Sequence, residues 1–138
     1  MSNAQEAIDK IIEIKEWYRK LPKSYAVGTV LQDASRMLST NLFTVRDVLG
    51  EIQSEYISTK HLRKARFAEV KFKFAQAGSV AKAESEAESD SDYKALALRE
   101  SELESTAARL KITIEATDDV LASLRQHISL IKTDSYGS

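Results

Sequence analysis

Residues 92–132 read DYKALALRESELESTAARLKITIEATDDVLASLRQHISLIK and decide the fold. Apolar side chains recur along this stretch in alternating steps of four and three residues, with no Gly or Pro between them. That spacing is typical of a helix that packs along its whole length on other helices. With a rise of 1.5 Å per residue, such a helix would be about 60 Å long. The stripe consists of Leu96, Glu100, Leu103, Ala107, Leu110, Ile114, Thr117, Leu121, Leu124, Ile128 and Ile131, of which nine are apolar.

The composition predicts an all-α protein of a single domain over residues 1–138. Four Gly, one Pro and 30% charged residues leave too few turns for an all-β fold. The formal net charge of −1 provides no overall basic field for nucleic acid, and the absence of cysteine excludes disulfides and thiolate metal sites. No apolar run is as long as a membrane helix, and the acidic N-terminus is unlike a signal peptide. We therefore expect a cytoplasmic protein with no membrane partner.

Two helices are predicted before residue 78. The first covers residues 3–20 and ends because Pro22 lacks a backbone donor and disfavours the helical conformation at the residue before it. The second covers residues 25–77 and ends at Gly78. It is either one long helix or two helices joined by a kink near residues 39–44. Its apolar stripe is Leu38, Leu42, Val45, Leu49, Ile52, Tyr56 and Thr59.

Residues 79–91 connect this region to the last helix, predicted over 92–132. They contain one large apolar side chain and four carboxylates, so they are predicted to be an acidic surface connection. Ser79 can cap any short helix that follows it, and either Asp90 or Ser91 can cap the last helix.

These elements predict a long antiparallel helical hairpin with a coiled-coil seam and a shorter N-terminal helix. Two such helices are too thin to cover both apolar faces, so we expect a homo-oligomeric helical bundle. The polar residues Glu100 and Thr117 within the stripe are a common means of fixing helix register. The candidate oligomerisation residues are Leu96, Leu103, Leu110, Ile114, Leu121, Leu124, Ile128 and Ile131.

The sequence contains no recognisable catalytic or metal-binding pattern. Neither histidine, His61 or His127, follows a Glu by three residues as in di-iron bundles, and neither belongs to an H-E-x-x-H zinc motif. Glycine-rich phosphate loops are also missing. We therefore expect a protein that is not an enzyme and takes no cofactor, metal or small-molecule substrate.

One segment, residues 60–74, carries local positive charge. It holds six Lys or Arg against one Glu, interleaved with three Phe. Cations pair with phosphates and aromatic rings stack on bases, so this combination suits single-stranded nucleic acid. The candidate nucleic-acid-binding residues are Lys60, Arg63, Lys64, Arg66, Phe67, Lys71, Lys73 and Phe74.

A structural interpretation of the same segment stays open. Tyr56, Phe67 and Phe74 continue the core stripe, so their rings can be buried while lysine stems line the seam. Residues 84–104 carry eight acidic and two basic side chains. If the chain folds back after Gly78, these acids lie beside the basic segment and offset its field.

The order of features resembles the UvsY-type recombination mediators, small helical proteins of tailed phages. The stretch that carries the resemblance runs from Leu38 to Lys132. In it, a basic helix with aromatic residues precedes a Gly-containing acidic turn and a long final helix, and Tyr93 lies at the start of that final helix. The resemblance implies a ring-like or bundled oligomer, in the host cytoplasm, that binds single-stranded DNA and helps load a recombinase past a single-strand-binding protein.

The sequence thus predicts a non-enzymatic accessory protein of phage-type DNA recombination or replication. Its partners would be further copies of itself, single-stranded DNA and recombination or replication proteins. The alternative is a helical protein–protein interaction module without DNA binding, such as a virion structural or scaffold component or an inhibitor of a host system.

Overall fold

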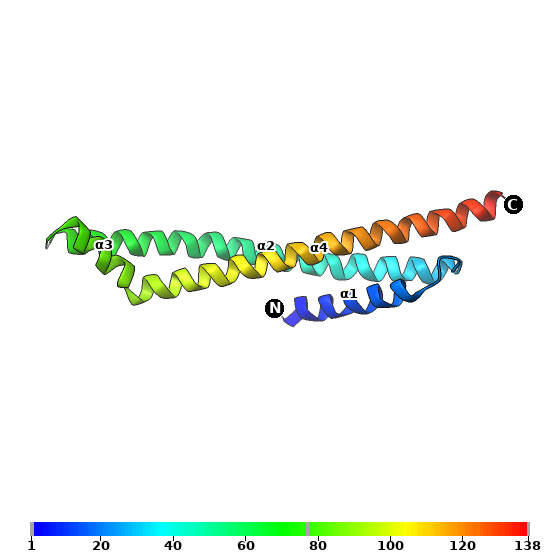
Figure 1. The fold of residues 1–138 in the computed structure, drawn as a ribbon, viewed down its shortest axis with the longest axis horizontal. Coiled ribbons are helices and arrows are strands. Elements are labelled where there is room, and N and C mark those ends of the chain that lie inside the picture. The colour runs from blue at the N-terminus through cyan, green and yellow to red at the C-terminus, as the bar shows by residue number, and fades with distance from the viewer. Residues whose placement is uncertain (1, 77, 138) are drawn as a thin grey trace. The chain divides into compact units, whose positions relative to one another are not determined.

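The computed structural model describes residues 2–76 and 78–137, with side chains described over 3–76 and 78–132. All elements formed by these residues are α-helices (Figure 1), which confirms the all-α prediction. Within the described ranges, no helix is both long and apolar enough to cross a membrane. The helices are α1 (Ser2–Lys20), α2 (Gly28–Ala75), α3 (Val80–Ser89) and α4 (Ser91–Gly137).

Helix α2 runs through residues 39–44 without interruption, so the alternative of two joined helices is wrong. The polar side chains at this point bond to carbonyls of their own helix instead of breaking it. Thr40 Oγ1 donates to the Arg36 carbonyl at 3.0 Å, and Asn41 Nδ2 donates to the Met37 carbonyl at 2.7 Å. Such bonds to the preceding turn satisfy Thr and Asn without a cap, so the helix continues.

The acidic connection contains a helix of its own, α3. Ser79 caps it, because its hydroxyl accepts the Lys82 backbone N–H at 3.2 Å. Ala83 and Ala87 are fully buried, although neither is a large apolar residue. The prediction of a surface connection was therefore incomplete: one face of α3 is part of the core.

The described residues form two compact units. Unit 1 comprises the chain up to Leu49 together with the chain from Arg109 onward, and unit 2 comprises Gly50–Ala108. Helices α2 and α4 each contribute to both units. The prediction of one domain over residues 1–138 stays a prediction.

Unit 1 has a core of large aliphatic side chains from three helices. The apolar faces of α1, α2 and α4 are buried at helical spacing, as the sequence predicted for the stripes on α2 and α4. Burial of one such side chain stabilises a fold by about 1.5–3 kcal/mol. The largest fully buried side chains of unit 1 are Ile11, Leu31, Leu38, Leu42, Val45, Thr117 and Leu124.

Unit 2 has a thinner core. Its buried apolar residues include three large ones, and the remaining ones are alanines. Because less apolar area is buried per helix turn, the pairing of charged side chains matters more to this unit than to unit 1. The buried side chains of unit 2 are Ile52, Thr59, Val70, Ala83, Ala87, Leu103 and Ala107.

The two polar residues of the α4 stripe have different roles. Thr117 is fully buried in unit 1, and its hydroxyl donates to the Thr113 carbonyl of its own helix at 2.7 Å. Glu100, in unit 2, instead forms an ion pair with Arg63 of α2. The sequence predicted that both residues fix the register of α4 against another helix. Of the two, only Glu100 makes a described polar contact with another helix.

Candidate nucleic-acid interface

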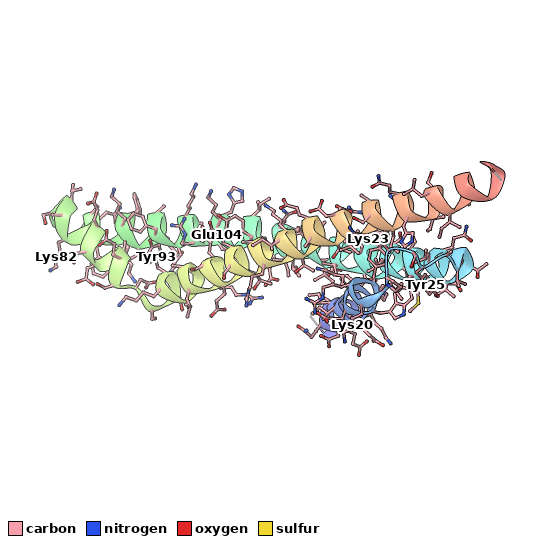
Figure 2. All side chains as sticks on the ribbon, turned by 45° about the vertical axis from the view of Figure 1, so that its right-hand side comes forward. Lys20, Lys23, Tyr25, Lys82, Tyr93 and Glu104 are labelled. Carbon is pink, nitrogen blue, oxygen red and sulfur yellow. The ribbon has the colours of Figure 1, made fainter. Side chains whose placement is uncertain are left out.

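The basic segment, residues 60–74, lies on α2 within unit 2, where acidic side chains of α3 and α4 meet it. The side chains of this unit are drawn in Figure 2, with Lys82 on α3 and Tyr93 and Glu104 on α4. Three of the six cations are paired with carboxylates of these helices or of the residue between them.

Arg66 and Asp90 form a pair in which two hydrogen bonds join the guanidinium to the carboxylate. Arg66 Nε lies 2.8 Å from Asp90 Oδ2, and Arg66 Nη2 lies 2.9 Å from Asp90 Oδ1, so the guanidinium binds both carboxylate oxygens. Glu69 at 3.5 Å and Asp92 at 3.6 Å lie near the same guanidinium. These carboxylates raise the pKa of Arg66 and leave little of its charge for an external phosphate.

Asp90 also joins α3 to α4. Its carboxylate accepts the Tyr93 backbone N–H at 2.9 Å, which makes it the N-cap of α4, as one of the two predicted caps. Its own backbone N–H donates to the Ala87 carbonyl at the end of α3. The Arg66 guanidinium and the Tyr93 N–H together lower the pKa of Asp90 from 3.8 to about 2.

The substitution Asp90→Asn tests whether the Arg66–Asp90 pair stabilises the fold, because the effect of the substitution on stability should depend on pH. Asparagine caps helices about as well as aspartate, so the variant loses mainly the ionic bond to Arg66. Because the pKa of Asp90 is lower in the folded state than its ordinary value of 3.8, the carboxylate stabilises the fold above that pH. This stabilisation is lost as the pH falls toward 2.

We expect the Asn variant to melt a few degrees below the wild type near neutral pH and at the same temperature near pH 2. Circular dichroism melting curves at both pH values check this. Asp90→Ala, which removes the cap as well, should melt lower still at every pH. Equal melting of the Asn variant and the wild type at neutral pH would contradict the role of the ion pair.

Arg63 and Lys71 are the other paired cations. Arg63 donates to Glu100, and the two side chains are only 23% and 14% exposed. This hydrogen bond raises the pKa of Arg63, although burial acts in the opposite direction. Lys71 Nζ lies 3.2 Å from Glu84 on α3.

The unpaired cations do not form one surface. Lys60, Lys64 and Lys73 have no ion pair among the described residues. Lys64 and Lys73 are nine residues apart, which at about 100° per residue places them on opposite sides of α2. Only Lys60 and Lys64 remain as neighbours on one strip.

The aromatic rings of the segment divide between two faces of α2. Phe67 is half-buried, with its ring centroid 5.4 Å from that of Tyr93, and Phe74 is also half-buried. Both rings are thus partly withdrawn from water, as the structural interpretation expects, and a stacking role for them stays a prediction. Phe72, which was not among the candidate residues, is 68% exposed.

Phe72 belongs to an exposed face that the sequence analysis missed. We define the outer α2 face as Ile57, His61, Ala65, Ala68, Phe72 and Ala75. All six are exposed, and His61 is the single polar member. They follow one another at steps of three or four residues and lie opposite the buried Ile52 and Val70. A second apolar stripe at helical spacing, out of phase with the core stripe, is the signal that could have found this face.

The candidate oligomerisation residues lie mostly in the core of the chain itself. Leu103, Leu110, Ile114, Leu121 and Leu124 are buried, whereas Leu96, Ile128 and Ile131 are half-buried. A second copy would find little of the first five accessible. Self-association through these residues stays a prediction.

His127 has structural bonds at both ring nitrogens in unit 1. Its Nε2 lies 2.8 Å from the Tyr25 carbonyl, which can only accept, so Nε2 carries the proton. In the neutral ring Nδ1 then accepts the Tyr18 hydroxyl at 3.3 Å. Burial raises the pKa of Tyr18. Within the described ranges no group of three or more His, Asp or Glu side chains could hold a metal ion.

Comparison with protein-family models, curated proteins and solved structures finds no match to this chain.

Proposed function

We propose that this chain is a non-enzymatic helical interaction module whose protein partner binds the outer α2 face. The observation that carries the proposal is the contrast between the two sides of α2 in unit 2. On one side, Arg63, Arg66 and Lys71 are satisfied by carboxylates of the same unit. On the other, the outer α2 face, which includes Phe72, is left exposed by the part of the chain that the structure describes.

Support also comes from the chemistry of such a face. Exposed apolar side chains that follow one another along a helix face, as Ala65, Ala68, Phe72 and Ala75 do, are a common mark of helix–helix association between chains. A nucleic-acid surface of this size would instead present cations that are free to contact phosphates. Three of the six candidate cations, Arg63, Arg66 and Lys71, are instead paired with carboxylates of the same unit.

A photo-reactive phenylalanine analogue placed at position 72 tests this proposal in the cells that make the protein. We expect irradiation to yield a discrete covalent adduct with a protein. The matched control carries the same analogue at position 98 on α4, where Leu98 is similarly exposed at 62% but its exposed neighbours one turn away are Lys94, Ala95, Ser101 and Glu102, none of them a large apolar residue. Equal adducts at both positions, or none at position 72, would overturn the proposal.

A phage-type recombination accessory that binds single-stranded DNA, similar to the UvsY-type mediators, is the second candidate. Lys60 and Lys64 have no ion pair among the described residues and lie on the helix that also carries the exposed Phe72, and this combination of residues favours it. If the three unpaired lysines contact phosphates, the logarithm of affinity should fall against the logarithm of salt with a slope of about −2.

Fluorescence anisotropy of a labelled oligonucleotide over a series of salt concentrations measures this slope. Lys64→Glu should then weaken binding, whereas Lys82→Glu on α3 should not. Absence of binding at low salt would remove this candidate. A slope near −4 would mean that all six cations contact phosphate, which requires the ion pairs of Arg63, Arg66 and Lys71 to open.

We further propose that α2 and α4 pair as an antiparallel hairpin and that the module is cytoplasmic and self-associates. Support for the hairpin comes from the order of contacts within unit 2. Glu55 pairs with Arg99, whereas Arg66, further along α2, pairs with the earlier Asp90. In antiparallel packing, the residue numbers of one helix rise along the pair while those of the residues that they contact on the other helix fall.

A further inference from the structure

We infer that the outer α2 face binds the same face of a second copy of this chain, with the two α2 helices parallel. This inference rests on the proposed function, because it names the partner of the face already assigned to a protein. It concerns Ile57, His61, Ala65, Ala68, Phe72 and Ala75, not the stripe on α4 that the sequence predicted for self-association.

The composition of the outer α2 face suits close contact between two helices. Ala65, Ala68 and Ala75 let the backbones approach, and Phe72 and Ile57 supply apolar area that is exposed in the single chain. Covering this apolar area in a complex removes it from water and so favours association. Residues 57–75 provide a contact about 27 Å long.

The charges beside this face identify the partner as a second copy. Lys60 and Lys64 border it on one side, and Glu69 borders it on the other, at about 100° of rotation per residue. A face with cations on one border and an anion on the opposite border is complementary to itself under two-fold symmetry. Lys64 has no ion pair among the described residues. Glu69 lies 3.5 Å from Arg66 of its own helix, but its side chain is 71% exposed and can also meet a charge from outside.

The same charges select the parallel orientation. Glu69 follows Lys64 by five residues, which is the separation at which flanking charges of two parallel helices meet across a coiled-coil seam. Two-fold symmetry then forms the Lys64–Glu69 pair twice. In an antiparallel pair the lysine borders would face each other, and so would the glutamates, and like charges repel.

The contact is at the small end of specific interfaces, so we expect a dimer with a dissociation constant of about 10 to 100 μM. Sedimentation equilibrium of the full chain over a concentration range that brackets these values should show a monomer–dimer equilibrium. Phe72→Glu should weaken it at least tenfold. Leu98→Glu places the same charge at a similarly exposed position of α4 and should leave it unchanged.

Charge reversal tests the orientation. Lys64→Glu and Glu69→Lys should each weaken self-association of the variant by itself. Mixing the two variants should restore the dimer, because the Glu at position 64 of one chain then meets the Lys at position 69 of the other. In an antiparallel dimer each single variant would only replace one contact between like charges by another, so neither would weaken association, and that result would overturn the inference.

Cysteine cross-linking provides a second readout, because the chain has no native cysteine. In the parallel dimer Ala68 faces Ala68 of the other copy, so Ala68→Cys should form a disulfide-linked dimer under mild oxidation. The control Ala95→Cys, on the exposed side of α4, should remain monomeric. Equal cross-linking of both variants would contradict the inference.

The outcomes separate this inference from the proposed function. A chain that is monomeric throughout the concentration range, while the probe at position 72 still captures a different protein, overturns the second copy and leaves the interaction module intact. A dimer that Phe72→Glu does not weaken also overturns the inference. A chain that forms no dimer and captures no protein removes both proposals, and oligonucleotide-dependent assembly would replace them with the DNA-binding candidate.

Discussion

Replacement of Leu124 by alanine should lower the free energy of unfolding by about 2–5 kcal/mol, the usual cost of truncating a buried leucine. Leu124 is fully buried in unit 1, where α1, α2 and α4 supply the large aliphatic core. The truncation loses the transfer free energy of three carbon atoms and leaves a cavity. Other fully buried side chains of the unit 1 core, such as Leu38 and Leu42, could refill this cavity only by shifting their own helix.

Two spectroscopic probes measure this effect in urea titrations. Trp17, the single tryptophan, lies on α1, so its fluorescence follows unit 1. Circular dichroism follows all helices. We expect Leu124→Ala to shift the fluorescence transition to lower urea. Leu130→Ala changes the same residue type on the same helix at a position 57% exposed, and it should change stability by less than about 0.5 kcal/mol.

The relation between the two probes also tests the difference between the units. Because unit 2 has the thinner core, we expect the circular dichroism transition to begin at lower urea than the fluorescence transition. Coincident transitions in the wild type and in both variants would mean that the two units unfold as one. A stability loss below about 1 kcal/mol for Leu124→Ala would contradict the tight packing of unit 1.

The parts of this fold that could be predicted from sequence are those set by local periodicity. The α4 stripe from Leu103 to Leu124 is buried where the heptad spacing placed it, because one helix face follows from residues three and four apart. The burial of Phe67 and Phe74 follows from the same rule. Phe72 lies on the opposite face of α2 for the same reason. Placing each of the three Phe residues by helical spacing would have separated Phe72 from the other two.

The parts that could not be predicted depend on contacts distant in sequence. A heptad stripe does not reveal whether it is covered by the same chain or by another copy, because both use the same packing. Ala83 and Ala87 of α3 are buried although their sequence resembles a surface connection. The acidic stretch was recognised as a possible partner for the basic one. Which charges meet, such as Lys71 with Glu84, depends on where the chain turns back, and composition does not specify that point.

The Arg63–Glu100 pair should give the second large effect, since it is the most buried ion pair of the described residues. Glu100→Ala leaves the Arg63 guanidinium largely shielded from water without its carboxylate. We expect a loss of about 1–3 kcal/mol, below the cost of breaking a fully buried pair because both side chains keep some exposure. Urea titration followed by circular dichroism measures the loss.

The control is Asp118→Ala, which breaks another pair between α2 and α4. Asp118 accepts two hydrogen bonds from Arg46 in unit 1, at 2.8 and 2.9 Å, but these side chains are 46% and 52% exposed. Water can replace the lost bonds there, so we expect a loss of less than about 1 kcal/mol. If the two alanine variants lose equal stability, burial is not what makes the Arg63–Glu100 pair important.

The double variant Arg63→Met with Glu100→Leu distinguishes stability from specificity. Both substitutions keep an extended side chain that can fill the space, and neither leaves an unpaired charge. We expect the double variant to be within about 1 kcal/mol of the wild type or more stable, because replacing a buried ion pair with apolar groups removes its desolvation cost. The single variants should each be less stable than the double. The pair would then act mainly against wrong registers of α2 and α4 in unit 2, since a shift by one helix turn in either direction would bring Thr59 or Phe67, which carry no positive charge, opposite Glu100.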